Sequence, residues 1–388
     1  MNNNIAPDGG GIFNYDARVL VNNTLFGGNY AQDLGGGVGA LSSYNYINNS
    51  LFEGNYAFYG GGVGALSSYN SIDNSVFDEN LAYVGGAVLN FYETYSNVFS
   101  STFENNMGYE AGGAIANGYG VLSYVDSSIF KNNDAEFGGG VATNTYSEAV
   151  IMNFVFVGNT SYGYGAGVAT WDMSEALILN DTFTGNVAYQ GGGGAIANGP
   201  DGQSEISNTI LWDDMAVNVP ATSEIFDYYY GDHDGVSYVF YSDIMGGWGG
   251  YGADNINADP LFVNAPADWD VCRNTGTTTT LEVVDGSIYQ VGDVIEINMD
   301  GVARTVTAVV DNTVTFSPAF SRNTWGGDIV VIWGVGVTNI VFDLSLRANS
   351  PAIDAGWAAS GYAPAVDILG NPRPSGATWD MGAYEYQQ

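Results

Sequence analysis

Two short stretches of the chain hold residue types that could perform acid-base chemistry. Asp213 and Asp214 are adjacent, and Asp232 and Asp234 flank His233, which is the single histidine of the sequence. A pair of carboxyl groups about 5 to 10 Å apart can serve as acid and base in the hydrolysis of a glycosidic bond. The catalytic candidates are therefore Asp213, Asp214, Asp232 and His233, and the alternative is that all four are ordinary turn and loop residues.

Aspartates in the same part of the chain could instead bind a cation. Asp232, Asp234, Asp254 and Asp259 lie in segments rich in Gly and Asn, which we expect to be loops. Loop carboxylates and carbonyls are typical ligands of Ca²⁺, although the spacing matches neither an EF-hand nor a glycine-rich calcium-binding repeat. Ca²⁺ is thus the one cofactor that the sequence suggests, and solvated surface aspartates are the alternative.

The composition excludes some classes of partner. The chain of 388 residues has 42 acidic and 7 basic residues, a formal net charge of −35. Such a charge opposes binding to nucleic acid, which requires Lys and Arg on the phosphates, and opposes binding to an anionic membrane surface. No apolar run is long enough for a transmembrane helix, and the single Cys272 excludes an intrachain disulfide.

An internal repeat of 25 to 27 residues organises the first half of the chain. A Phe recurs at that spacing, as Phe26, Phe52, Phe77, Phe103, Phe130, Phe156 and Phe183. Three residues after each Phe stands an Asn, as Asn29, Asn55, Asn80, Asn106, Asn133, Asn159 and Asn186. Five residues before each Phe stands Val or Ile, and eleven to thirteen residues after it a Gly cluster precedes another Val or Ile. Seven agreeing registers indicate a solenoid.

The repeat predicts an all-β, right-handed parallel β-helix. Its segments are short, β-branched and separated by Gly and Asn, and none has a helical period. A coil of this length fits three short strands with three corners, stacked on the next coil at ~4.8 Å. We expect the Phe and Val or Ile columns to fill the bore, with a corner or a bulge between them. The Asn is expected to adopt a left-handed conformation and to hydrogen-bond along its column. The Gly cluster is expected to supply positive φ or a close backbone approach at a tight corner.

One outward column is a candidate binding surface. The residues six positions after each repeat Phe are mostly aromatic: Gln32, Phe58, Tyr83, Tyr109, Glu136, Tyr162 and Tyr189. If this position faces outward, Tyr83, Tyr109, Tyr162 and Tyr189 form a stripe that could stack on sugar rings or on a neighbouring protomer. The alternative is an aromatic stack that shields the Gly corner.

Two sets of motifs resemble known families. GGAIAN at 112–117 and 193–198, with FENN at 103–106, resembles the repeats of polymorphic outer-membrane proteins and related surface β-helices, over residues 4 to about 210. NINADPLFVN (255–264), SPAIDAG (350–356), DILGNPRP (367–374) and WDMGAYEY (379–386) resemble the C-terminal portion of the choice-of-anchor Q class. These resemblances imply an extracellular or cell-surface protein, often adhesive, whose C-terminal motifs close and cap the β-helix.

The second half of the chain departs from the repeat. In the last coil of the repeat, we expect Trp212 in place of the Phe and Met215 in place of the Asn. Residues 277–320 alternate apolar and polar side chains between Asp-Gly and Gly-Asp turns, which predicts antiparallel hairpins in a small barrel or sandwich. The predicted domains are therefore a β-helix over 1–271, an inserted β module over 272–340 and a closing coil or cap over 341–388.

These observations favour a structural or adhesive protein that forms a homo-oligomer or a filament, because the chain opens on half a coil whose strand edges could pair with another copy. The alternatives are a polysaccharide lyase or glycoside hydrolase, or a Ca²⁺-dependent glycan-binding module, each with an extracellular polysaccharide as partner. Asp213-Asp214 and His233-Gly235 resemble two polygalacturonase elements, but the other two elements of that family are missing. A lyase needs a basic catalytic residue, and the repeats contain only Lys131 and Arg18.

Overall fold

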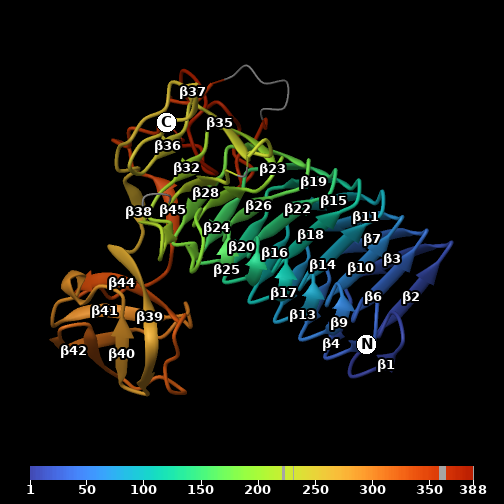
Figure 1. Cartoon of the computed structure of the whole chain (residues 1–388), viewed down its shortest axis with the longest axis horizontal. Helices are drawn as coiled ribbons and strands as arrows, with labels where there is room; N and C mark the ends of the chain where they lie inside the picture. The colour runs from blue at the N-terminus through green and yellow to red at the C-terminus, as the bar shows by residue number, and fades with distance from the viewer. Residues whose placement is uncertain (221–222, 230, 358–363, 388) are drawn as a thin grey trace. The chain divides into compact units, whose positions relative to one another are not determined.

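The computed structural model describes residues 1–220, 223–229, 231–357 and 364–387 (Figure 1). The chain divides into two compact units. The first comprises Met1–Pro260 and Ala348–Gln388, and the second comprises Leu261–Arg347. The first unit is a parallel β-solenoid with coils of about 26 residues, and the second contains a closed antiparallel barrel. The predicted fold class, all-β with a β-helix and a small inserted barrel, is confirmed.

Four parallel sheets form the solenoid, and each coil adds one strand to each sheet (Figure 1). The first sheet consists of β1 (Ile5–Ala6), β5 (Tyr30–Ala31), β9 (Tyr56–Tyr59), β13 (Leu81–Val84), β17 (Met107–Ala111), β21 (Asp134–Phe137), β25 (Thr160–Tyr164), β29 (Val187–Ala188) and β33 (Met215–Ala216). The second consists of β2 (Ile12–Tyr15), β6 (Val38–Leu41), β10 (Val63–Leu66), β14 (Val88–Phe91), β18 (Ile115–Gly118), β22 (Val141–Asn144), β26 (Val168–Thr170), β30 (Ile196–Asn198) and β34 (Ile225–Asp227).

The two remaining sheets follow the same order. The third sheet consists of β3 (Arg18–Asn22), β7 (Tyr44–Asn48), β11 (Tyr69–Asp73), β15 (Tyr95–Phe99), β19 (Leu122–Asp126), β23 (Glu148–Met152), β27 (Glu175–Leu179), β31 (Gln203–Ser207), β35 (Val236–Phe240) and β37 (Tyr251–Ala253). The fourth consists of β4 (Leu25–Gly27), β8 (Leu51–Glu53), β12 (Val76–Asp78), β16 (Thr102–Glu104), β20 (Ile129–Lys131), β24 (Val155–Val157), β28 (Thr182–Thr184), β32 (Ile210–Leu211) and β36 (Asp243–Ile244).

The expectation of three strands in each coil is wrong, because a coil turns four corners. In one coil the corners fall at Asn23, Gly28, Gly35 and Ser42, all of which have positive φ. A residue in that region cannot continue a strand, so each corner ends one strand and lets the next begin. The corner at Asn23 separates the Val21 and Phe26 positions, as expected, and both side chains are buried in the bore.

Stacked aromatic rings fill the bore. The seven repeat Phe side chains are all fully buried: Phe26, Phe52, Phe77, Phe103, Phe130, Phe156 and Phe183. Neighbouring rings lie nearly parallel, with centroids 4.5 to 5.0 Å apart. The Val or Ile five residues earlier is buried in every coil. Because stacked pairs of this kind add to the free energy gained from burying the rings, the repeated apolar residues have the packing role that the sequence predicts.

The repeat Asn residues form a buried, hydrogen-bonded ladder. In each pair of neighbouring coils the earlier Asn donates its Nδ2 to Oδ1 of the next, along Asn29, Asn55, Asn80, Asn106, Asn133, Asn159 and Asn186. Asn80 Nδ2, for example, donates to Asn106 Oδ1 at 2.9 Å and also to the carbonyl of Phe52 at 2.8 Å. The predicted hydrogen bonding along the column is thus confirmed.

The backbone conformation predicted for these Asn residues is wrong. The left-handed residue lies one position before the ladder in every coil, at Gly28, Gly54, Glu79, Asn105, Asn132, Gly158 and Gly185. None of the seven ladder residues, Asn29, Asn55, Asn80, Asn106, Asn133, Asn159 and Asn186, has positive φ. The corner must precede the Asn, because the Asn side chain has to point into the coil to reach its copies on either side.

The tight corner requires Gly, as predicted. Gly35 has φ of +67°, and a Cβ there would lie 2.1 Å from the carbonyl oxygen of Val38. The equivalent residues of the other coils, Gly60, Gly85, Gly112, Gly138, Gly165 and Gly193, have the same conformation. A side chain at this corner would therefore meet the backbone itself.

The predicted register at the end of the repeat is wrong by one residue. Leu211, not Trp212, pairs with Phe183 and is fully buried in the Phe column. Asp214, not Met215, takes the Asn position, because its Oδ1 accepts from Asn186 Nδ2 at 2.7 Å. The prediction followed the aromatic residue type, whereas the spacing of five residues from the buried Ile206 was the reliable guide.

The second unit is a six-stranded closed barrel with strand order β39-β40-β43-β42-β41-β44. Its strands are β39 (Asp268–Thr277), β40 (Thr280–Val283), β41 (Asp293–Ile297), β42 (Arg304–Val310), β43 (Thr313–Ser317) and β44 (Ile329–Val335), with the 3-10 helix η2 (Gly286–Ile288) before β41. β38 (Phe262–Asn264) pairs with β45 (Asp343–Leu346) at the ends of the unit. The single cysteine, Cys272, lies in the barrel core, and burial raises the pKa of its thiol. Within the described residues, no helix has the length and apolar character needed to cross a membrane.

Candidate functional site

A groove of about 600 Å³ runs over the outer face of the third sheet, across β15, β19, β23, β27, β31 and β35. Three tyrosines and three glutamates line it, together with aliphatic side chains between them: Tyr95, Tyr124, Tyr238, Glu148, Glu175 and Glu205. Concave surfaces that combine aromatic faces with a few polar groups are typical of ligand sites. We take this groove as the candidate functional site.

The strand geometry explains why these side chains point outward. In a five-residue strand such as β23, the second and fourth residues, Ala149 and Ile151, face the bore and are buried. The first and third residues, Glu148 and Val150, therefore face outward. Because parallel pairing is in register, Glu148 lies beside Glu175 of β27 on the neighbouring coil. The outward residues thus form columns that run along the solenoid.

Aromatic groups lie toward both ends of the groove. Near one end the rings of Tyr69 and Tyr95 are stacked, with centroids 5.6 Å apart, and Tyr44 extends this group by one coil. Near the other end the rings of Tyr238 and Tyr251 lie 5.5 Å apart. Tyr124 lies between the two groups; burial and the nearby Asp126 raise the pKa of its phenol.

The groove is acidic. The side chains of Glu148, Glu175 and Glu205 are exposed, and none of the lining residues is Lys, Arg or His. In-register like charges such as Glu148 and Glu175 repel one another and so destabilise the sheet. The groove therefore combines negative charge with aromatic rings.

The catalytic candidates Asp213 and Asp214 occupy structural positions. Asp213 has φ of +64° and takes the corner position that precedes each ladder residue. Asp214 ends the Asn ladder, and burial raises the pKa of its carboxyl to about 7. Burial and the neighbouring Asp214 likewise raise the pKa of Glu224. The two carboxyl groups therefore form a buried pair at the end of the repeats.

The other catalytic candidates lie in an exposed loop. His233 Nδ1 lies 2.7 Å from Asp201 Oδ2, and Asp232 beside it is exposed. Asp201 is another positive-φ turn residue, with φ of 57°. The contact of His233 is thus with a turn between coils.

The structure gives no support to the predicted Ca²⁺ site. Asp232, Asp254 and Asp259 are exposed, and Asp234 is half-buried. Within the described ranges, no group of three or more His, Cys, Asp or Glu side chains is arranged to hold a metal ion. Asp254 is engaged with the hydroxyl of Tyr241, whose pKa it raises.

The predicted aromatic stripe faces outward on the first sheet. Tyr83, Tyr109 and Tyr162 are 43%, 52% and 59% exposed, whereas Tyr189 is half-buried. Phe58 stacks on Tyr83 with centroids 4.9 Å apart. Glu110 raises the pKa of Tyr83 through its charge and a hydrogen bond. The binding role of these four tyrosines stays a prediction, and it concerns a different sheet from the groove.

The C-terminal segment covers the far ends of the strands that carry the groove. Asn153 Nδ2 donates to the carbonyl of Val366, and Asn180 Nδ2 donates to that of Asp380, both at 3.1 Å. The outward Met152 and Leu179 at these strand ends are buried. The segment thus lies along the side of successive coils, and one end of β23 and β27 is left open as the groove.

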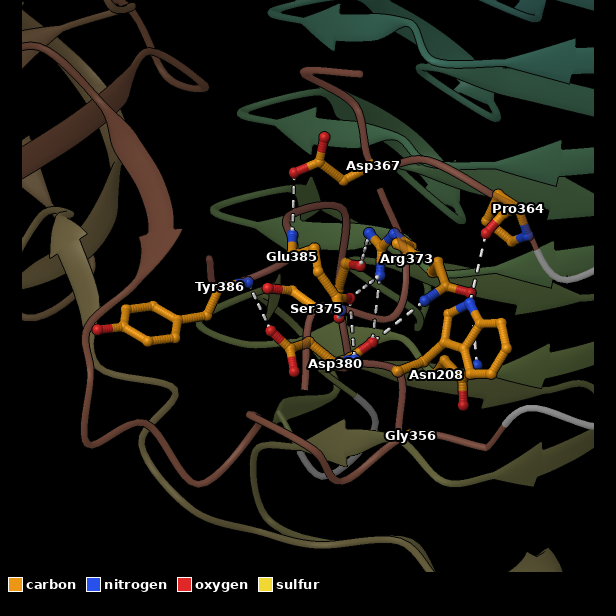
Figure 2. A network of polar contacts seen from close by, with 12 residues as sticks. Asn208, Gly356, Pro364, Asp367, Arg373, Ser375, Asp380, Glu385 and Tyr386 are labelled. Carbon is orange, nitrogen blue, oxygen red and sulfur yellow. Dashed lines mark hydrogen bonds and ion pairs between the residues drawn. The ribbon is translucent and has the colours of Figure 1, made fainter. Parts of the chain in front are cut away.

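A buried ion pair holds this segment together (Figure 2). Arg373 Nη1 lies 3.3 Å from Glu385 Oε2, both side chains have no exposed surface, and Arg373 Nη2 donates to the carbonyl of Gly382 at 2.8 Å. Burial lowers the pKa of Arg373 and raises that of Glu385. Glu385 also accepts from the backbone of Ser375 and Asp380. The motifs around 367–374 and 379–386 therefore build one polar network.

Glu148, Glu175 and Glu205 were not among the site residues predicted from the sequence. Glu148 and Glu175 stand eight residues before a repeat Phe, at a position that holds Tyr in three earlier coils. Like the aromatic stripe, this column is visible in the sequence when outward residues are aligned on the repeat Phe. The sequence signal for the groove was thus the change from Tyr to Glu at one outward position of successive coils.

Comparison with family models, with curated proteins and with solved structures finds no match to this chain. The fold itself defines the class: the chain is a parallel β-solenoid with about eight turns and a small barrel.

Proposed function

We propose that this chain is a structural β-solenoid that binds an extended polysaccharide along the groove of the third sheet. One observation carries the proposal: tyrosine faces and carboxylates line a single groove that crosses six coils in register. Sugar rings pack their apolar faces on aromatic side chains, and their hydroxyls donate to carboxylates.

The shape of the groove suits a linear polymer. The coils repeat at ~4.8 Å along the solenoid, which is close to the length of one pyranose unit in an extended β-linked chain. Successive sugar units can therefore meet equivalent positions on successive coils. The resemblance of the repeats to surface β-helices, together with the strongly acidic composition, supports a location outside the cytoplasm, either secreted or attached to the cell surface.

Titration of the full chain with soluble oligosaccharides of neutral, amino and uronic sugars tests this function. We expect at least one class to bind, and Tyr95→Ser to weaken that binding about tenfold, because one stacked ring is lost. The matched control is Tyr30→Ser, which removes a tyrosine of the first sheet that has the same exposure as Tyr95 and is likewise stacked on the Tyr of a neighbouring coil. Absence of binding to every class, or an equal loss in both variants, would contradict the proposal.

A second candidate function rests on the pair Glu148 and Glu175. Neighbouring strands are ~4.8 Å apart, which is close to the carboxyl separation of retaining glycosidases. One carboxylate would act as nucleophile and the other as acid and then base. Release of reducing ends by the full chain, abolished in Glu175→Gln, would establish hydrolysis. Binding without any release of reducing ends would leave the groove as a binding site alone.

A further inference from the structure

We propose that the groove takes a polysaccharide whose sugar units carry free amino groups. This inference rests on the proposed function, because it names the class of glycan for the same groove. It follows from the charges of the lining residues, from their register and from the distribution of basic residues over the chain.

Among the residues that the structure describes, no basic side chain forms an ion pair with a carboxylate of the groove. Each of Glu148, Glu175 and Glu205 lies in a strand of the third sheet, and the ion pairs found among the described residues involve none of them. Of the basic residues in the repeats, Lys131 pairs with Glu104, and Arg18 packs over the ring of Tyr46 at 4.5 Å. A ligand must therefore supply any positive charge in the groove.

The register of the carboxylates fits charges that repeat along a polymer. Glu148 and Glu175 lie in register on adjacent coils, and Glu205 lies on the next coil, two residues further along its strand. Their mutual repulsion is relieved when an ammonium group lies between them. A free metal ion is a poorer match, because the described side chains form no group of three or more metal ligands.

The same charges select against uronic acids. A polyuronate would bring one carboxylate per sugar unit toward a groove that already holds three, on a chain with a net charge of −35. Like charges brought together weaken the binding of a wrong partner and so contribute to specificity. An N-acetylated or unsubstituted sugar chain would avoid the repulsion but would leave the carboxylates without partners.

Three sets of oligosaccharides of equal length separate these classes: β-linked glucosamine, its N-acetylated form and galacturonic acid. Affinities for the full chain are measured by calorimetry at mildly acidic pH, where the amino groups are protonated. We expect glucosamine oligomers to bind most tightly, and Glu148→Gln or Glu175→Gln to weaken them about fivefold each, as for a partly exposed ion pair. Added salt should also weaken the binding.

The control is Glu53→Gln, which removes an exposed carboxylate of the fourth sheet. An equal loss in this variant would mean that the oligomers respond to overall charge, and would overturn the assignment. Equal or tighter binding of the N-acetylated or uronic oligomers would overturn the amino-sugar class and leave the proposed glycan-binding function intact. If none of the three sets binds, the proposed function fails, and this inference fails with it.

Discussion

The inward and outward columns of the same coils follow different rules. Inside the bore, seven successive coils place the same Phe at one position, and all seven rings are buried. Eight residues earlier, the outward column of the third sheet changes from Tyr44, Tyr69 and Tyr95 to Glu148 and Glu175. A ring packed between two other rings loses contacts when its volume changes, whereas the volume of a residue that faces solvent is less constrained. A residue type repeated in an inward column therefore indicates the fold. A change of residue type in the outward column of the third sheet marks the candidate site.

Truncation of one inward ring should have the largest effect of the changes considered. In Phe103→Ala, the ring that stacks between Phe77 and Phe130 is lost, and we expect a loss of about 4 kcal/mol in the free energy of unfolding. Urea unfolding followed by circular dichroism measures this loss. Hydrogen exchange should locate it in β12, β16 and β20, because coils contact only their neighbours.

The matched control is Tyr109→Ala, which removes an outward aromatic ring six residues further along the same coil. We expect a change within about 0.5 kcal/mol, as for most surface substitutions. If the two variants lost similar stability, the distinction between inward and outward columns would not hold.

Much of the fold could be predicted because few physical requirements determine the inward residues: apolar packing, paired hydrogen bonds and tight corners. A Phe every 25 to 27 residues predicts a stack of rings, an Asn at a fixed offset predicts a ladder of hydrogen bonds, and a Gly cluster predicts a tight corner. The alternation over residues 277–320 likewise predicted a small barrel or sandwich, since hairpins with one apolar face must bury it, and the structure shows the barrel.

The details that escaped prediction depend on three-dimensional register. The fourth strand of each coil depends on where positive φ falls, and many residue types other than Gly adopt it, for example Ser42 and Glu79. The groove is visible only after outward residues of different coils are aligned. The position of the C-terminal segment along the third sheet depends on contacts between residues about 200 positions apart, such as Asn180 with Asp380. No local sequence pattern encodes such contacts.

Asp214 takes the inward position that holds Asn in the seven preceding coils. Its buried carboxyl predicts that the stability of the fold depends on pH. The folded chain holds the pKa of this carboxyl at about 7, against 3.8 when it is unfolded and solvated. The carboxyl therefore contributes its full stability below about pH 4 and loses it as the pH rises through 7. The two pKa values differ by about 3 units and one unit corresponds to about 1.4 kcal/mol, so we expect a loss of up to about 4 kcal/mol between acidic and neutral pH.

Asp214→Asn places the residue of the seven preceding coils at the end of the ladder. We expect the variant to be more stable than the natural chain at neutral pH, and its decline from acidic to neutral pH to be shallower, with Glu224 as the remaining buried carboxyl. Chemical denaturation at a series of pH values measures both effects. Parallel profiles for the two proteins would show that Asp214 is not the group that titrates.

Glu148→Gln should have the smallest effect, and it tests whether the outward column is arranged for stability or for binding. Removing one charge relieves the repulsion with Glu175 in register, so we expect the free energy of unfolding to rise by about 0.5 kcal/mol. High salt should abolish this gain, because it screens the repulsion in the natural chain.

Glu205→Gln serves as the control, since its register neighbours Leu177 and Tyr238 are uncharged and no gain is expected. A loss of stability in Glu148→Gln would mean that the carboxylate supports the fold. A gain in the free energy of unfolding would mean that the groove holds a charge that destabilises the fold, as expected of a residue that serves to bind a ligand.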